Sequence, residues 1–160
     1  MAVAIVLALG FVFRFVLAAL LPPGYDEAYY LFYGQNLSLS YFDHPIAVGL
    51  WSWFGQGLGT TPLALRFPSV CSYTLALGLL GSATARWFGP QARFWTLLVG
   101  SFCPLVFICG GVLLLPDAPL LLALALLLWW LSRHPRATPA NARQAFELGA
   151  VFAAITLSKY

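Results

Sequence analysis

Residues 2–30 read AVAIVLALGFVFRFVLAALLPPGYDEAYY and contain the two features that decide the fold. An apolar run of about 20 residues, the length of helix that crosses a bilayer, is followed by Pro22-Pro23-Gly24, a strong helix breaker. Two acidic residues, Asp26 and Glu27, come directly after the break. The stretch therefore predicts a first transmembrane helix over residues 2–21 that ends beside an acidic segment.

Similar apolar runs recur along the rest of the chain, which is 61% hydrophobic and only 8% charged. A soluble domain of this size could not bury so much apolar surface. The composition predicts an all-α, polytopic membrane protein and gives no indication of nucleic-acid binding. The further predicted spans cover residues 62–87, 94–109, 116–131 and 145–160. The fifth run is cut at Tyr160, so we expect the chain to be the N-terminal part of a larger transmembrane domain.

Residues 22–61 are too polar for an ordinary span and are rich in Tyr and Trp. These residue types favour the membrane–water boundary, where an apolar ring and a polar tip are both satisfied. We expect an external loop with two interfacial helices, over about Glu27–Leu37 and Ile46–Leu58. A turn at Asp43-His44-Pro45 would join them.

Lys and Arg residues predict the orientation, because short cytoplasmic loops carry an excess of them. The loops at residues 86–93 and 133–143 contain five arginines and no acids, whereas residues 25–61 and 110–116 contain no Lys or Arg. The N-terminus and the arginine-rich loops are therefore predicted to be cytoplasmic. The acidic, aromatic loops are predicted to face the outside of a plasma or inner membrane.

Two arginines lie within the apolar runs. Arg14 lies about two turns from the outer end of the first span, at a depth where a charge costs about 2.5–3.5 kcal/mol and usually faces protein or water. We expect it either to pair with an acid or to extend to the outer headgroups. Arg66, near the outer end of the second span, is expected either to lie at the interface or to bind a phosphate, since a guanidinium matches phosphate oxygens.

Asp26 and Glu27 have both a structural and a chemical interpretation. Acids in the first turn of a helix are stabilised by its N-terminus, and Asp117, after Pro116, could cap a helix in a similar way. Neighbouring residues on a helix point about 100° apart, so Asp26 and Glu27 cannot act as a facing carboxylate pair. The sequence therefore favours a single general base over a two-carboxylate glycosidase.

Asp43 and His44 bring a carboxylate and an imidazole together. They either form a simple turn before Pro45 or act as a metal-ligand pair or a phosphate contact. No spacing in the chain is specific for a metal. We therefore predict no cofactor, with a divalent ion at Asp43 and His44 as the open alternative.

Five short motifs fall on the predicted outer face. They are Gly24–Tyr30 (GYDEAYY), Tyr41–Pro45 (YFDHP), Leu65–Ser69 (LRFPS), Leu115–Pro119 (LPDAP) and Leu157–Tyr160 (LSKY). Together and in this order they resemble the N-terminal part of a GT-C glycosyltransferase of the dolichyl-phosphate-mannose-protein mannosyltransferase type (family 39), a group that includes the related aminoarabinose-lipid A transferases. The resemblance spans essentially the whole chain but only the first part of such an enzyme.

The resemblance implies a GT-C-type helical bundle that transfers a hexosyl group, with inversion, from a polyprenyl-phosphate-linked sugar to an acceptor outside the membrane. It implies that Asp26 is the catalytic base, with Glu27 beside it, and that Asp43 and His44 lie near the donor phosphate. The second proline that the family's turn motif often carries is Ile46 in this chain.

The residue types suit this reaction. An inverting transfer needs a carboxylate that takes the proton of the attacking hydroxyl, and the departing phosphate gains negative charge that cations can stabilise. Arg66, His44 and Lys159 are the predicted phosphate contacts, and Asp117 joins them as a substrate-binding residue. The predicted partners are the lipid-linked sugar donor, membrane lipids and an acceptor protein, lipid or glycan.

Two other interpretations are open. The same charges could line the path of a transporter or flippase-like protein, although transporters tend to show repeats and helices interrupted at the membrane midplane. The chain could also be a degenerate membrane fragment without catalytic activity. Even for a transferase, we expect five spans without the rest of the bundle to be inactive.

Overall fold

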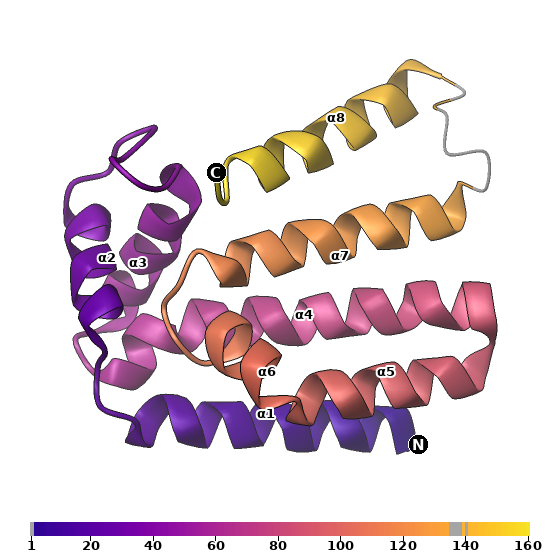
Figure 1. The fold of residues 1–160 in the computed structure, drawn as a ribbon, viewed down its shortest axis with the longest axis horizontal. Helices are drawn as coiled ribbons and strands as arrows, with labels where there is room; N and C mark the ends of the chain where they lie inside the picture. The colour runs from indigo at the N-terminus through magenta and orange to yellow at the C-terminus, as the bar shows by residue number, and fades with distance from the viewer. Residues whose placement is uncertain (1, 135–138, 140) are drawn as a thin grey trace.

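A computed structural model describes residues 2–134, 139 and 141–160 (Figure 1). This part of the chain is all-α, as predicted, and contains eight helices. They are α1 (Ala2–Leu20), α2 (Tyr25–Gln35), α3 (Ile46–Leu58), α4 (Pro62–Phe88), α5 (Pro90–Phe102), α6 (Pro104–Gly111), α7 (Asp117–Arg133) and α8 (Ala142–Thr156).

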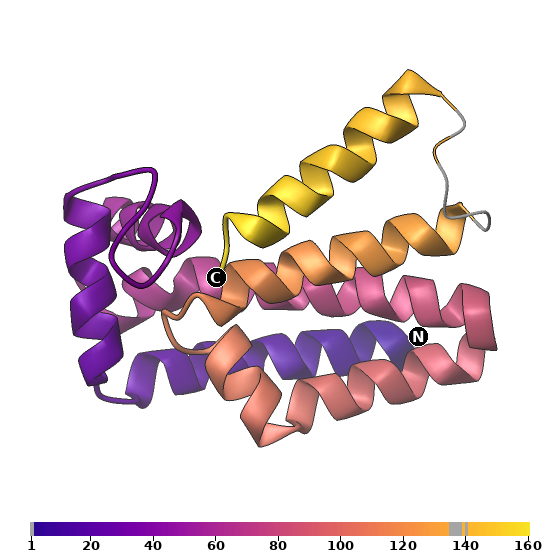
Figure 2. The same ribbon diagram turned by 45° about the horizontal axis from the view of Figure 1, so that its top comes forward.

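Helix α4 is the central element of the bundle. It contacts α1, α3, α5, α6 and α7, and both views show α1, α5 and α7 running alongside it (Figure 1, Figure 2). Helices α2 and α3 pack against each other across one end of the bundle. Helix α8 packs on α7, and the two diverge toward the N-terminal end of α8 (Figure 2).

The ends of α4 follow from its flanking residues. The side-chain oxygen of Thr61 accepts a hydrogen bond of 3.2 Å from the Ala64 backbone N–H, and Pro62 occupies the first turn, where its missing N–H is not needed. The helix stops at Gly89, whose φ of 89° suits glycine far better than other residues. The helix predicted over residues 62–87 is confirmed.

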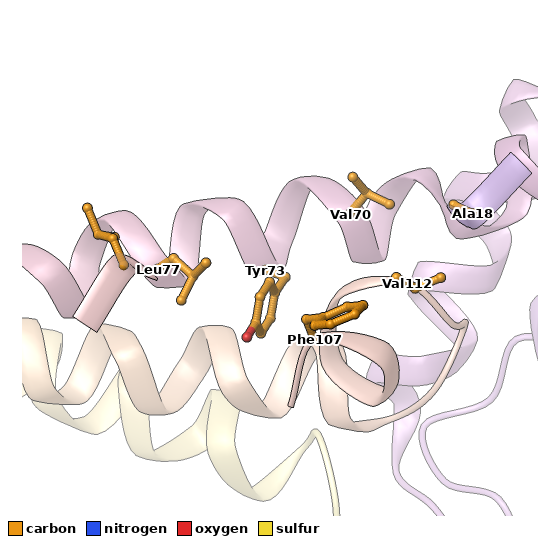
Figure 3. Packing of buried hydrophobic residues seen from close by; sticks show 7 residues of the cluster. Ala18, Val70, Tyr73, Leu77, Phe107 and Val112 are labelled. Atoms are coloured by element: carbon orange, nitrogen blue, oxygen red, sulfur yellow. The ribbon is translucent and has the colours of Figure 1, made fainter. Parts of the chain in front are cut away.

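The main core lies where α1, α4, α5 and α6 meet, and Figure 3 shows the side chains of its seven buried members. Its buried members are Ala18, Val70, Tyr73, Leu77, Leu97, Phe107 and Val112. Small residues allow a close approach, since a Cβ on Gly111 would lie 2.7 Å from the Tyr73 ring. In a membrane, where lipid is as apolar as the core, such close packing is a main force that holds helices together.

Helices α1 and α4 are long and apolar enough to cross a membrane. The pair α5–α6 would add a third span, but the two helices are bent by 72° at the break between them. The span predicted over residues 94–109 is therefore not one continuous helix but corresponds to the bent pair α5–α6. Pro104 explains the break, because proline lacks an N–H and disfavours helical backbone in the residue before it. Cys103 is accordingly extended, with φ −76° and ψ 108°.

Helices α7 and α8 have 17 and 15 residues, fewer than the about 20 of a typical span. Helix α7 confirms the helix predicted over residues 116–131. Helix α8 ends at Thr156, so the expected continuation of the fifth helix to residue 160 is wrong. The chain turns toward α3 instead, and the Leu157 carbonyl accepts a hydrogen bond of 3.1 Å from the Ala47 N–H.

Both helices expected in the loop of residues 22–61 are present as α2 and α3. Glycines allow them to pack closely. A Cβ on Gly34 of α2 would lie 2.5 Å from the Ser52 hydroxyl of α3, and one on Gly55 of α3 would lie 2.6 Å from the Leu65 carbonyl oxygen of α4. Gly57, elsewhere on α3, faces open space.

We expect Gly55→Ala to destabilise the protein by about 1–3 kcal/mol, because the added methyl meets backbone atoms of α4 and forces α3 away. Gly57→Ala is the matched control in the same helix. It should leave stability unchanged or raise it by up to about 1 kcal/mol, since alanine favours helix over glycine. Thermal unfolding followed by circular dichroism in detergent measures both variants, and equal shifts would contradict the close approach of α3 to α4.

Candidate functional site

Helix α2 is anchored by a buried ion pair. Glu27 in its first turn and Arg66 near the start of α4 are only 5% and 1% exposed. The guanidinium donates two hydrogen bonds to the carboxylate, from Nε to Oε1 (2.7 Å) and from Nη2 to Oε2 (2.6 Å). Parallel bonds of this kind make a strong and directional Arg–carboxylate contact.

The remaining donors of Arg66 close the C-terminal end of α1. Nη1 donates to the carbonyls of Ala18 (2.9 Å) and Leu21 (2.7 Å), and Nη2 donates to that of Pro22 (3.0 Å). The last carbonyls of a helix have no partner within the helix, and leaving them unpaired is costly in an apolar environment. These bonds and those to the carboxylate use all five N–H donors of the guanidinium.

Glu27 also accepts hydrogen bonds from two backbone N–H groups. Gly24 donates to Oε2 (3.0 Å), and Leu114, in the segment before α7, donates to Oε1 (2.9 Å). Burial would raise the pKa of Glu27, but the bonds from Arg66 and the two backbone groups outweigh it and hold the pKa below the ordinary value of 4.5. Glu27 is therefore a charged anchor that joins α1, α2, α4 and the segment before α7.

The ion pair of Glu27 and Arg66 affects the roles that the sequence predicts for both residues. The sequence predicts Glu27 as a catalytic neighbour of Asp26 and Arg66 as a phosphate contact. The Arg66 guanidinium has no donor left for a phosphate, and the Glu27 carboxylate is turned into the protein. Both residues position the start of α2, which is a structural role that the sequence did not predict.

Asp26, the predicted base, lies outside the anchor. It is the next position on α2, about 100° around the helix from Glu27, and it is exposed. It has no hydrogen-bond or ion-pair partner within the described residues. A carboxylate held on a helix with its oxygens open to solvent can accept a proton from a bound ligand.

Three predicted acids lie around Tyr30, which is buried in α2. The pKa of Tyr30 is raised to about 12, first by burial and then by the negative charges of Asp43, Asp26 and Asp117. These acids come from three separate segments: α2, the connection to α3, and the start of α7. The fold therefore brings together acids that are far apart in the sequence.

A group of tyrosines holds Asp43. Tyr33 donates its hydroxyl hydrogen to Oδ1 of Asp43, and the Tyr33 oxygen lies 2.8 Å from that of Tyr29. The rings of Tyr33 and Tyr41 are stacked with centroids 3.6 Å apart, and burial together with the bond to Asp43 raises the pKa of Tyr33. The sequence did not predict this role of Tyr29 and Tyr33. The available signal was the spacing of residues 29 and 33, which places them on one helix face.

His44 lies beside Asp43, with Nε2 3.9 Å from Oδ2 of the carboxylate. Its ring centroid is 5.6 Å from that of Tyr30, and its buried Nδ1 has no hydrogen-bond partner among the described residues. Within the same residues, no group of three or more His, Cys, Asp or Glu side chains that could hold a metal ion lies together. Asp43 and His44 thus supply at most two ligands.

The C-terminal residues reach the same end of the molecule. Lys159 Nζ forms an ion pair of 3.0 Å with Asp117 Oδ1, and the two side chains are 37% and 34% exposed. The Tyr160 hydroxyl hydrogen-bonds that of Ser40, in the connection between α2 and α3. The sequence placed Asp117 and Lys159 at one membrane face, and the structure brings them into direct contact.

Arg14 lies away from this group and is fully buried in the bundle. Its Nη2 donates to the Thr74 hydroxyl (3.0 Å), and its guanidinium lies over the Tyr73 ring, 5.0 Å from the centroid. Neither of the arrangements expected from the sequence, an acidic partner or extension to the headgroups, is found in the part of the chain that the structure describes.

Comparisons with known proteins do not identify a family. No family model, curated protein or solved structure matches the chain. The resemblance to GT-C glycosyltransferases therefore rests on the five motifs, and its functional consequences are proposals.

We expect Glu27→Gln to destabilise the protein by about 3–5 kcal/mol, because it leaves the buried charge of Arg66 without its anion. Asp26→Asn is the matched control, since it removes the same charge from the neighbouring, exposed position and should change stability by no more than about 0.5 kcal/mol. Denaturant unfolding in detergent micelles measures both. If the two variants were equally stable, Glu27 would not be the anchor of α2.

The lowered pKa of Glu27 also predicts how stability depends on pH. The contribution of the ionised carboxylate is fully present above its unfolded-state pKa and is lost as the pH falls through its lower folded-state value. As the pH falls from about 5 to about 3, the wild-type protein and Asp26→Asn should lose stability more steeply than Glu27→Gln. Unfolding temperatures measured across this range provide the test, and parallel curves for all three proteins would contradict it.

Proposed function

We propose that the chain forms part of a membrane enzyme that transfers a glycosyl group from a polyprenyl-phosphate-linked sugar to an acceptor on the outer face of the membrane. The observation that carries the proposal is the environment of Asp26. This exposed carboxylate, which has no partner among the described residues, stands next to a buried anchor, at the end of the bundle that also holds Asp43, Asp117 and Lys159. A carboxylate that is fixed in position and open on one side suits a general base.

In the proposed reaction, the oxygen of an acceptor hydroxyl attacks the anomeric carbon from the side opposite the phosphate. Its proton passes to Asp26 as the new glycosidic bond forms. The bond between the anomeric carbon and the phosphate oxygen breaks at the same time. The products are the glycosylated acceptor, with inverted configuration, and the polyprenyl phosphate. This chemistry needs one free carboxylate, which agrees with the engagement of Glu27 in the fold.

The departing phosphate gains negative charge that donors in the site must stabilise. Lys159 is the best candidate, because its ammonium uses one of its three N–H donors on Asp117 and is partly exposed. His44 is the second, since its Nδ1 has no partner among the described residues. Arg66 would act indirectly, by holding α2 and thereby Asp26 in place.

The proposed topology puts the acidic end outside a plasma or inner membrane and the arginines in the cytoplasm. In this topology, helices α1 and α4 supply two spans, and the bent pair α5–α6 would supply a third. Helix α7 is at the lower end of the spanning range of about 17–25 residues, and α8 with the residues after Thr156 would complete the five spans of a GT-C-type bundle. Arg136, one of the predicted cytoplasmic arginines, lies outside the described residues.

Asp26→Asn should lower the rate of sugar transfer by about 10²–10⁴-fold, the usual contribution of a general base, with little change in the KM for the donor. Asp26→Glu keeps a carboxylate and should retain part of the rate, whereas Lys159→Gln should mainly raise the donor KM. Membranes that contain each variant in the full-length enzyme would be assayed with radiolabelled polyprenyl-phosphate sugars. A wild-type rate in Asp26→Asn would exclude Asp26 as the base.

One observation favours a second function, namely the 72° break between α5 and α6. Broken helices within the membrane are common in transporters, where they form substrate sites. A transporter or flippase-like protein would move the lipid-linked sugar without transferring it. In the same membranes, movement of labelled donor between leaflets without a glycosylated product would support this function over the transferase.

A further inference from the structure

A groove of about 620 Å³ separates α7 from α8 at the end of the bundle opposite Asp26. The two helices diverge toward this end (Figure 2). Arg133, which lines the groove, is the last residue of α7, whereas Asp117 is the first. At 1.5 Å per residue the two lie about 24 Å apart along the helix axis. The groove is therefore separate from the proposed catalytic site.

The mouth of the groove is basic and aromatic. The guanidinium of Arg133 lies over the ring of Trp129, 4.7 Å from its centroid. Arg133 is exposed and has no acidic partner within the described residues, so its N–H groups can meet a ligand. The His134 ring stacks on Trp130 with centroids 4.0 Å apart. Tryptophans with a nearby cation are typical of the boundary between lipid and water.

The one acidic side chain that lines the groove among the described residues is already paired. Glu147 accepts hydrogen bonds from Arg143 Nε (2.9 Å) and from Trp130 Nε1 (3.2 Å). Among the described residues, Arg133 is therefore left without an acidic partner. The N-terminus of α8 opens at the same place, and its backbone N–H groups add to the attraction for an anion.

The groove becomes apolar along both helices, away from the mouth. Leu126 lies about two turns before Arg133 in α7, and Phe146, Ala150 and Val151 line the α8 side. A small hydrophilic anion would use the charged mouth alone. A molecule with a phosphate joined to a hydrocarbon chain would use both parts.

We propose that this groove binds an anionic phospholipid, with Arg133 at the headgroup phosphate and an acyl chain along Leu126 and Ala150. Charge complementarity at the mouth and the apolar floor both favour a lipid over free phosphate, and the volume lies within the range of about 300–1,000 Å³ that is usual for ligand sites. The proposed topology places the mouth at the cytoplasmic surface, where basic pockets between membrane helices bind such headgroups. The inference requires the membrane setting but not the transfer reaction.

Spin-label spectroscopy tests this inference on the chain reconstituted in phosphatidylcholine vesicles. The fraction of motionally restricted lipid should be larger for spin-labelled phosphatidylglycerol than for spin-labelled phosphatidylcholine. Arg133→Gln should lower the association of phosphatidylglycerol about fivefold, which corresponds to the ~1 kcal/mol expected for one arginine near the surface. Arg86→Gln is the matched control, because it removes an exposed arginine from the same end that does not line the groove.

Ala150→Phe provides a second test that leaves every charge in place. The phenylalanine side chain fills the apolar floor of the groove and should also weaken the binding of phosphatidylglycerol. This variant therefore tests the proposal even if Arg133→Gln does not fold. Three results would overturn the proposal: equal association of both lipids, equal losses in Arg86→Gln and Arg133→Gln, or displacement of the labelled lipid by inorganic phosphate. The last result would indicate a site for a free anion.

Discussion

The ion pair of Glu27 and Arg66 is the interaction on which the acidic end of the molecule depends. Burying two charges costs several kcal/mol for each, and their attraction offsets this only with good geometry and further hydrogen bonds. Both conditions are met, since a two-bond fork joins the pair and backbone groups satisfy what remains. Those backbone groups belong to the end of α1, the connection from α1 to α2 and the segment before α7. One ion pair therefore holds together parts of the chain that contribute separately to the candidate site.

Anchoring one of two neighbouring acids determines where the other one points. Because successive residues on a helix are about 100° apart, the inward position of Glu27 directs Asp26 outward, into solvent. Two carboxylates that look equivalent in the sequence thus differ in burial, in partners and in availability. Asp43 is also positioned by a contact within the protein, because the Tyr33 hydroxyl donates a hydrogen bond to its carboxylate. The site is largely positioned by contacts within the protein, which is what a reaction that depends on orientation requires.

Hydropathy and helix breakers were sufficient to predict most of the helices. The bounds of α1, α3 and α4 differ from the predicted ranges by at most one residue. Two errors have different causes. Pro104 is a visible break signal, but it lies within a long apolar run whose hydropathy favours one continuous helix. The end of α8 at Thr156 could not be predicted locally, because the turn that follows is stabilised by contacts with Ala47 and Asp117, which are distant in the sequence.

The sequence predicts which residues gather in the candidate site, but it does not predict which of them form ion pairs with each other. Charge segregation places four of the five acids at one end, and the pKa of Tyr30 reflects three of these four together. The charged pairs form between residues that are distant in the sequence. Glu27 and Arg66 are 39 positions apart, and Asp117 and Lys159 are 42 positions apart. Helix periodicity relates residues three or four positions apart and cannot predict such contacts. The chain has few cationic side chains, and one whose N–H donors are all bonded within the protein is not available to bind a ligand. Arg66 is engaged through every donor, so the partly exposed Lys159 is the cation at this end best able to meet a phosphate.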